Sequence, residues 1–259
     1  MSSTIIDSHA HLGWDSFAED RNEVIQRAFA EGVRPIVNAG VDLKGIPELL
    51  SLADEFQEIF VGIGLHPHEA KFWTDQSADE IRKAAKHQKV VAIGECGLDY
   101  FYNHSERETQ LLVFSEQIKL AVELEKPLII HTRDAWDDTF NLLREHGQGK
   151  VRGVFHCFTG GPEVIPTIKE LDFYVSFSGI VTFPKAGDLQ AAAPLVDSER
   201  LMVETDCPYL APQGKRGKRN EPAFVWIVAE KLAQLRGVSK SEIAELTSRN
   251  ARRLFSLPD

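Results

Sequence analysis

The sequence predicts an α/β protein, a single (β/α)8 TIM-type barrel domain over residues 1–259 with extra helices at its C-terminal end. Three observations support this fold class. Eight short segments rich in Val and Ile recur along the chain, helix-length polar-patterned segments separate most of them, and the length of 259 residues is close to the ~250 typical of such barrels. A doubly wound open sheet is the alternative arrangement of alternating strands and helices.

The predicted strands are near-continuous apolar runs, which is typical of a parallel sheet covered on both faces. They occupy residues 4–12, 34–41, 58–67, 90–99, 126–134, 151–160, 172–181 and 200–208.

The clearest helix is predicted over residues 106–125, because apolar side chains recur there three or four positions apart. Pro127 ends it. A helical C-terminal tail is expected over residues 222–256. Capping boxes, in which Ser precedes Glu by three positions, predict three helix starts. They are Ser105 with Glu108, Ser77 with Glu80, and Ser239 with Glu242.

Composition is that of an ordinary globular protein, with 43% hydrophobic residues and a net charge of −10. An acidic chain is a poor general coat for nucleic acid, although it can still hold phosphate through metal ions. We expect no membrane segment and no secretory signal, hence a cytoplasmic protein, because no apolar run approaches ~18 residues. A chain of this length forms its own core, so no obligatory protein partner is expected.

Metal-ligand side chains stand at the predicted carboxyl ends of the strands, where (β/α)8 barrels carry their active sites. Strand one ends in two histidines two positions apart, which alternation directs to one face. Strand three also ends in two, His66 and His68. The candidate ligands from the strands are His9, His11, Glu95, His131, His156 and Asp206.

Imidazole and carboxylate groups are ligands for divalent metals such as Mg²⁺, Mn²⁺ or Zn²⁺. Six donors exceed the needs of one ion, so the sequence predicts two ions bridged by Glu95. His9, His11 and Asp206 would complete one site, and His131 with His156 the other. Cys96, Cys157 and Cys207 each follow a ligand directly, and alternation turns them outward as small apolar groups.

Seven motifs together resemble the TatD family of metal-dependent deoxyribonucleases, a branch of the amidohydrolase-like barrels, over nearly the whole chain. They are IDSHAHL (6–12), GLHPH (64–68), IGECGLD (93–99), IIHTRDA (129–135), FHCFTG (155–160), ETDCPYLAP (204–212) and RNEP (219–222).

The resemblance implies a TIM-type barrel whose divalent metals are held by the same six ligands, with Glu95 in place of a carboxylated lysine. It further implies Mg²⁺-dependent hydrolysis of DNA, often 3′→5′ on single strands, with roles in DNA repair and fragmentation. In the predicted reaction a hydroxide formed at the metal attacks phosphorus, and Asp206 accepts the proton while Glu95 holds the metals.

Several side chains near the predicted site are candidates for binding substrate phosphates, with RNA as a second substrate beside DNA. His66, His68 and Arg133 lie next to the ligand strands, although Arg133 could equally form a structural salt bridge. Glu204 could orient a ligand histidine or be a buried partner for a nucleobase. A run of basic residues follows strand eight. It either forms a solvent-exposed surface or binds the nucleic-acid backbone. It contains Lys215, Arg216, Lys218 and Arg219.

Aromatic residues near the strand ends could stack nucleobases, although packing is the more common role. They are Tyr100, Phe101, Tyr102, Phe158 and Tyr209.

Two other functions fit the same ligands. One is a metal-dependent hydrolase of a carbonyl substrate, such as an aminoacyl-tRNA ester or a cyclic amide. The other is a metal-stabilised scaffold without catalysis, which the intact Asp206 disfavours.

Overall fold

The computed structural model describes residues 4–258, and within them the chain forms two compact units. The first unit contains the described residues up to Asn38 and those from His156 onward, and the second unit is Ala39–Phe155. The proposal that residues 1–259 form one functional domain stays a prediction.

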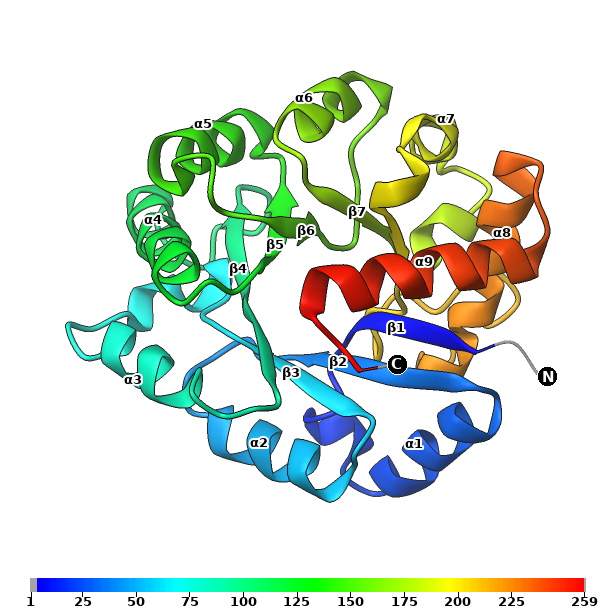
Figure 1. The fold of residues 1–259 in the computed structure, drawn as a ribbon, viewed down its shortest axis with the longest axis horizontal. Helices are drawn as coiled ribbons and strands as arrows, with labels where there is room; N and C mark the ends of the chain where they lie inside the picture. The colour runs from blue at the N-terminus through cyan, green and yellow to red at the C-terminus, as the bar shows by residue number, and fades with distance from the viewer. Residues whose placement is uncertain (1–3, 259) are drawn as a thin grey trace. The chain divides into compact units, whose positions relative to one another are not determined.

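The first unit holds the beginning and the end of the fold (Figure 1). Its N-terminal elements are β1 (Ile5–Ala10), η1 (Asp15–Phe17), α1 (Arg21–Ala30) and β2 (Val33–Ala39). Its C-terminal elements are η3 (Pro162–Val164), α6 (Ile165–Glu170), β7 (Tyr174–Phe177), η4 (Gly179–Thr182), α7 (Gly187–Ala192), η5 (Ala193–Leu195), η6 (Ser198–Arg200), β8 (Leu201–Val203), η7 (Pro222–Phe224), α8 (Val225–Arg236) and α9 (Lys240–Phe255).

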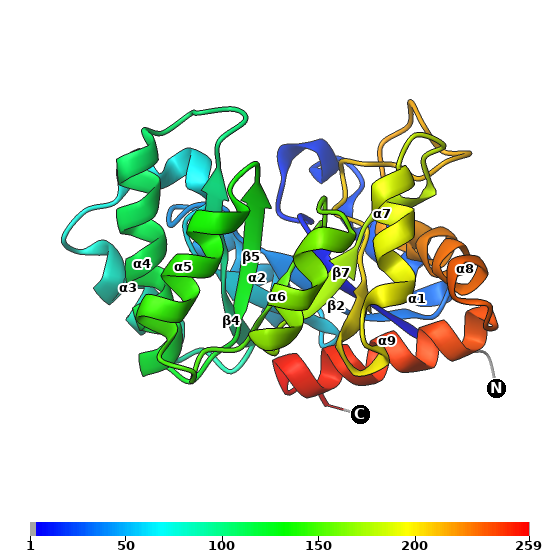
Figure 2. The same cartoon turned by 90° about the horizontal axis from the view of Figure 1, so that it is seen from above.

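The second unit alternates strands and helices in the same way, and Figure 2 shows α4 and α5 lying beside β4 and β5. Its elements are α2 (Ile46–Glu55), β3 (Ile59–Ile63), η2 (Pro67–Phe72), α3 (Ser77–Ala84), β4 (Val90–Asp99), α4 (Arg107–Glu123), β5 (Leu128–Arg133), α5 (Trp136–Gly147) and β6 (Gly153–Phe155).

The described strands follow one another in the sheet in chain order, from β1 to β8. Within each unit, neighbouring strands pair in parallel: β1 with β2, β4 with β5, and β7 with β8, for example. In the first unit β8 also lies against β1, as closure of a barrel requires. This order, with helices between the strands and α8 and α9 after β8, confirms the predicted (β/α)8 class with C-terminal helices.

Strand lengths differ from the sequence prediction except in β4, whose bounds are those expected. The strand expected over 58–67 ends at Ile63, so His66 and His68 lie beyond it, at the start of η2. The strands expected over 151–160 and 200–208 contain only three residues each. Glu95 is expected at the end of its strand, but it lies four positions before Asp99, the last residue of β4.

Only one of the three expected capping boxes is present. Ser239 and Glu242 form it reciprocally at the start of α9. Ser105 instead donates to the carbonyl of His68 at 2.8 Å, and Glu106 stands at the N-cap of α4. Ser77 is the first residue of α3, and its hydroxyl accepts a hydrogen bond from the amide of Thr74. Tertiary contacts therefore use the hydroxyl of Ser105, and a preceding turn uses that of Ser77.

Gly97 lets two ligand-bearing strands of the second unit approach closely. Its φ of +136° is a conformation that favours glycine, and a Cβ there would lie 1.9 Å from the carbonyl oxygen of His131. Gly97 is the register partner of His131 in the β4 and β5 pair. A side chain at position 97 would therefore displace the backbone that carries His131.

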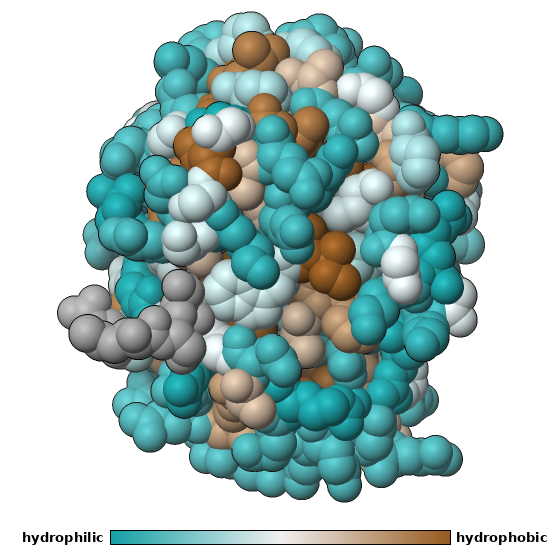
Figure 3. Space-filling model, turned by 90° about the vertical axis from the view of Figure 1, so that its right-hand side faces the viewer, coloured by the Kyte–Doolittle hydropathy of each residue, from teal (hydrophilic) through white to brown (hydrophobic). Residues whose placement is uncertain are grey.

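The side of the molecule on which α8 lies presents mostly hydrophilic side chains, with small separate apolar areas (Figure 3). The helices of the described residues include none with the length and apolarity to cross a membrane.

Gly97→Ala should lower the free energy of unfolding by about 3 kcal/mol or more, because overpacking adds to backbone strain. Gly149→Ala is the matched control: Gly149 also has a positive φ, of +65°, but nothing lies within 4 Å of its added Cβ. It should lose only about 1 kcal/mol. Urea unfolding measures both changes, and equal losses would contradict the role given to the close approach.

Candidate metal centre

In the first unit, hydrogen bonds hold β1 against the residues that follow β8. The amide of Asp206 donates to the carbonyl of His9 at 3.0 Å, and the amide of His11 donates to that of Cys207 at 2.8 Å. The buried Asp7 accepts from the amide and the hydroxyl of Thr205, at 2.9 and 2.5 Å. Burial raises the pKa of Asp7 to about 8. These bonds fix the backbone on which three candidate ligands stand.

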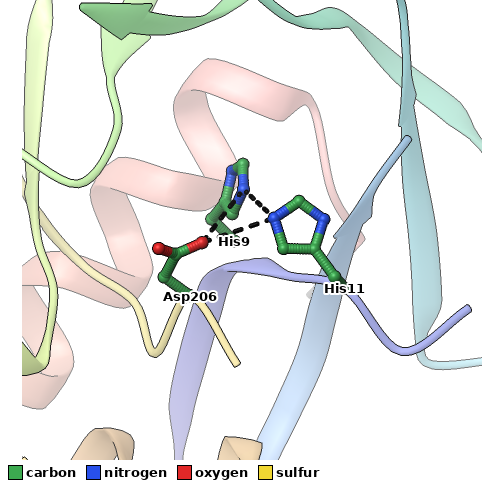
Figure 4. A group of neighbouring side chains, drawn as sticks. All are labelled: His9, His11 and Asp206. Atoms are coloured by element: carbon green, nitrogen blue, oxygen red, sulfur yellow. Dashed lines mark hydrogen bonds and ion pairs between the residues drawn. The ribbon is translucent and has the colours of Figure 1, made fainter. Parts of the chain in front are cut away.

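His9, His11 and Asp206 point their ligand atoms toward one another (Figure 4). The two Nε2 atoms lie 3.1 Å apart, and Oδ1 of Asp206 lies 3.3 Å from Nε2 of His11 and 3.7 Å from Nε2 of His9. All three residues are buried. Two imidazole nitrogens and a carboxylate oxygen facing one point form a donor set that fits a divalent cation. We call this set the β1/β8 group.

Asp206 is anionic at neutral pH. Burial alone would raise its pKa, but the hydrogen bond from His11 and the nearby imidazoles of His9 and His156 outweigh burial and hold the pKa below its usual value. A carboxylate that stays ionised in a buried place suits a cation ligand, because metal binding requires the deprotonated form.

His156 lies beside the β1/β8 group, in the residues that follow β6. Its ring stacks on that of His9, with centroids 3.9 Å apart. Its Nδ1 lies 3.3 Å from Oε1 of Glu204, a fully buried residue just after β8 that also accepts the amide of Cys157 at 2.6 Å. Glu204 is therefore the carboxylate beside Nδ1 of His156, and its role in orienting a ligand histidine stays a prediction.

The second unit has its own group of ligand atoms. Glu95 on β4 presents Oε1 to Nε2 of His66 at 3.2 Å and to Nδ1 of His131, on β5, at 3.1 Å. His66 comes from the N-cap of η2. One ligand atom from each of the three residues lies within 4.8 Å of the other two, close enough for the three to hold one metal ion. The sequence places His66 among the substrate-binding candidates, whereas the structure brings it to Glu95 and His131. We call this set the β4/β5 group.

Burial lowers the pKa of His66 to about 4, with Glu95 opposing the effect. Its imidazole is therefore neutral at pH 7. Its Nδ1 accepts the amide of His68 at 3.1 Å, so the ring proton lies on Nε2, toward Glu95, and a cation bound at Nε2 would replace that proton.

Asp99, which is not among the residues predicted from the sequence, supports the β4/β5 group. Its Oδ2 lies 3.0 Å from Nε2 of His131 and 3.0 Å from Nε2 of His68. Its Oδ1 accepts from the amides of Phe101 and Tyr102 at 3.0 and 2.9 Å. Burial raises the pKa of Asp99, but these hydrogen bonds outweigh it and leave the pKa well below its usual range.

This carboxylate sets the orientation of the His131 ring. Because Asp99 binds Nε2, the Nδ1 atom faces Glu95. The sequence contains a signal for this role: Asp99 lies four positions after Glu95 on the same strand, so alternation puts both on one face.

The predicted substrate-binding cations differ in their surroundings. Arg219 donates twice to Asp20, at 2.8 and 2.6 Å, so its charge is paired within the protein. Lys215 and Arg216 lie over the rings of Phe224 and Phe183, each at 4.7 Å. Lys215, Arg216 and Lys218 have no carboxylate within 4.0 Å among residues 4–258.

Arg133 forms no salt bridge with the described residues, which removes the structural alternative given for it. Its guanidinium lies over two aromatic rings instead, 4.0 Å from the centroid of Phe101 and 4.8 Å from that of Tyr102. Phe158 is buried against Phe177, so packing explains it. Tyr100 donates to Asp138, while Tyr209 is half exposed.

The cysteines stay outside the ligand groups of the described residues. Cys96 and Cys207 are buried, and burial raises the pKa of both thiols. Cys157 is only partly buried, and its sulfur lies 3.3 Å from Oγ of Ser178, so it differs from the small apolar group predicted.

Comparison with known proteins agrees with the donor sets. The model of the TatD related DNase family matches residues 6–256. The chain is 43% identical to the uncharacterized metal-dependent hydrolase YabD of Bacillus subtilis over 98% of this chain and 99% of that protein. It is 34% identical to the 3′-5′ ssDNA/RNA exonuclease TatD of Salmonella typhimurium over 98% and 99%.

Among solved structures, the TatD homologue YJJV of Escherichia coli K12 superposes with a TM-score of 0.93 at 30% identity, covering both chains completely. The fold and these matches define a metal-dependent hydrolase. The chain belongs to the TatD related DNase family.

Asp99→Asn should weaken the binding of a divalent ion about 10- to 100-fold, because an amide has one acceptor oxygen and no charge where the carboxylate accepts from two imidazoles and two backbone amides. Competition with a chromophoric chelator measures the affinity for Zn²⁺ or Co²⁺. Asp79→Asn, which removes an exposed carboxylate bound to Arg82, is the control and should bind as the unchanged chain does. Equal affinities of the two variants would remove Asp99 from the support of the site.

Proposed function

We propose that this hydrolase cleaves phosphodiester bonds of single-stranded nucleic acid, DNA above all and RNA second, removing nucleotides from the 3′ end. The observation that carries the proposal is the presence of two clusters of His and carboxylate ligand atoms in a member of the TatD related DNase family. The name of the Salmonella relative, an exonuclease of single strands, supports the substrate and the polarity.

The proposed ligands are the six predicted from the sequence, together with His66. His9, His11 and Asp206 hold one divalent ion, and His66, Glu95 and His131 hold another, while His156 is directed by Glu204. The bridging role of Glu95 and the identity of the ions, Mg²⁺, Mn²⁺ or Zn²⁺, stay predictions. When bound, the ions supply a Lewis acid that polarises the phosphoryl oxygens and acidifies a water molecule.

The remaining work falls to side chains of this chain. Asp206 is ionised, so it can take the proton of the attacking water, whose oxygen forms the new bond to phosphorus. The bond from phosphorus to the 3′ oxygen breaks, and that oxygen receives a proton. Within the second unit, Arg133 and His68 stand at the β4/β5 group and offer N–H donors to phosphate oxygens, and Arg presents a fork that matches them.

The name of the Salmonella relative favours a phosphodiester over a carbonyl bond, whereas charge favours a polyanionic substrate without choosing the bond. Lys215, Arg216 and Lys218 lie within four positions of one another after β8 and, like Arg133, have no carboxylate within 4.0 Å among residues 4–258; such a local cluster favours a polyanion even in a protein of net charge −10. The organophosphorus hydrolase of Deinococcus radiodurans, at 14% identity and a TM-score of 0.64, shares the fold alone.

The direct test uses chelator-stripped protein with Mg²⁺, Mn²⁺ or Zn²⁺ added back separately. Single- and double-stranded DNA and RNA, labelled at either end, report polarity and bond. The loaded enzyme should release mononucleotides from the 3′ end of single strands, and Asp206→Asn should slow cleavage at least about 100-fold. His87→Ala, which removes a histidine paired with Asp54 on the surface, should have no effect.

Two results would contradict the proposal. The first is undiminished cleavage by fully stripped protein or by Asp206→Asn. The second is hydrolysis of an aminoacyl ester or cyclic amide with no attack on any nucleic acid, which would favour the carbonyl alternative.

The basic run after β8 should set the salt dependence of binding. Changing Lys215, Arg216 and Lys218 to Gln should raise KM for single-stranded DNA. It should also flatten the plot of log affinity against log salt by about 0.7 for each phosphate that the loop no longer binds. Arg219 is excluded from the set, because its pairing with Asp20 supports the loop itself.

The control removes the same charge elsewhere, with Gln at the exposed Lys83, Lys86 and Lys150. Its salt slope should match that of the unchanged chain. Identical slopes for both triple variants would mean that the run is only a solvated face.

A further inference from the structure

Phe101 and Tyr102 form an exposed aromatic surface immediately after β4. The two residues are 56% and 50% exposed, although both carry large aromatic rings. The two rings meet edge to face, with centroids 4.9 Å apart. Leaving such area in water is unfavourable by roughly 25 cal/mol per Å². A flat ligand that covered these rings would therefore gain binding free energy.

The two rings differ in what already covers them. Tyr102 stacks in parallel with His104 at 5.6 Å and has Arg133 at 4.8 Å. Phe101 has the Arg133 guanidinium at 4.0 Å and the edge of Tyr102. With more than half of its side chain exposed, Phe101 keeps aromatic area for a flat partner.

Arg133 adds a charge to this surface. It has no carboxylate within 4.0 Å among residues 4–258, so its charge is available to an anion from outside. A guanidinium stacked on a ring keeps its N–H donors at its rim, where they can reach phosphate oxygens. An aromatic face beside an unpaired guanidinium matches a nucleotide, which joins a base to a phosphate.

The surface is fixed to the β4/β5 group through one carboxylate. Asp99 binds the amides of Phe101 and Tyr102 with Oδ1, and His68 and His131 with Oδ2. Asp99 is also the register partner of Arg133 in the sheet. A nucleotide held by Phe101 and Arg133 would therefore lie at a set distance from His131.

We propose that Phe101 and Arg133 form a nucleotide subsite, in which a nucleobase stacks on Phe101 and its phosphate binds Arg133. The inference rests on the proposed function, and it names the recognition element for an unpaired strand. Unpaired bases offer free faces for stacking, whereas a duplex offers only its terminal pair.

The test measures binding with metals chelated, because the subsite itself contains no metal. Fluorescence anisotropy compares a short single-stranded oligodeoxynucleotide with the same strand in which abasic residues replace the nucleotides. The unchanged chain should bind the normal strand about 5- to 100-fold more tightly. Phe101→Ala should remove most of this difference, Phe101→Leu should remove nearly as much, and Phe101→Trp should keep or enlarge it.

Phe72→Ala is the matched control. Phe72 is also 56% exposed and lies near two lysines, but its cation contacts are with Lys44 and Lys71 rather than with Arg133. This variant should keep the full preference for the normal strand.

The outcomes separate the subsite from the proposed reaction. A preference that survives in Phe101→Ala, or one that the unchanged chain lacks, overturns the subsite. Cleavage of the same strands is measured separately with metal restored. Base-dependent binding through Phe101 without any cleavage would leave the subsite standing and overturn the nuclease, whereas cleavage with no effect at Phe101 would do the reverse.

Discussion

The candidate site of the second unit depends on the hydrogen bonds of one buried carboxylate. An ionised carboxylate out of water is strongly unfavourable unless donors surround it. Asp99 meets this requirement with two imidazoles on one oxygen and two backbone amides on the other. The demand for partners therefore orients His131 toward Glu95 and shapes the turn that carries Phe101. Gly97, two positions earlier, admits the backbone of His131 close enough for this arrangement.

In the first unit, backbone hydrogen bonds rather than one buried carboxylate position the candidate ligands. There the backbone hydrogen bonds between β1 and the residues after β8 hold His9, His11 and Asp206 together. The pKa of Asp206 stays low because imidazoles surround it, whereas Asp7 nearby is driven toward its neutral form by burial. The two carboxyl groups, Asp7 on β1 and Asp206 after β8, are thus suited to opposite roles. Asp206 is suited to bind a cation, and Asp7 to form structural hydrogen bonds.

The alternation of strands and helices was predictable because apolar periodicity is a local property. β4 could be bounded correctly, since its apolar run ends in a turn. β6 and β8 are far shorter than predicted, because the residues that follow these strands are buried like those within them but do not continue the strand. Ser105 failed as a cap because its hydroxyl serves His68, a contact that sequence spacing does not reveal. The histidines and carboxylates at the strand ends could be predicted to be metal ligands. The contact of His66 with Glu95 could not, because it depends on how the chain turns into η2.

The pairing of Arg219 with Asp20 has a consequence for the segment between Pro212 and Asn220. The far end of this segment is clamped, since Arg219 also donates to the carbonyl of Ser16 and Asn220 bonds to the carbonyls of Thr205 and Tyr209. Gly214 and Gly217 adopt positive φ with open space around them. The segment is thus a short loop with a fixed end rather than a free tail. Because the segment is attached at its end, its lysines and arginine lose less conformational entropy when they bind an anionic strand. Less of the binding free energy of each contact is then offset by that loss.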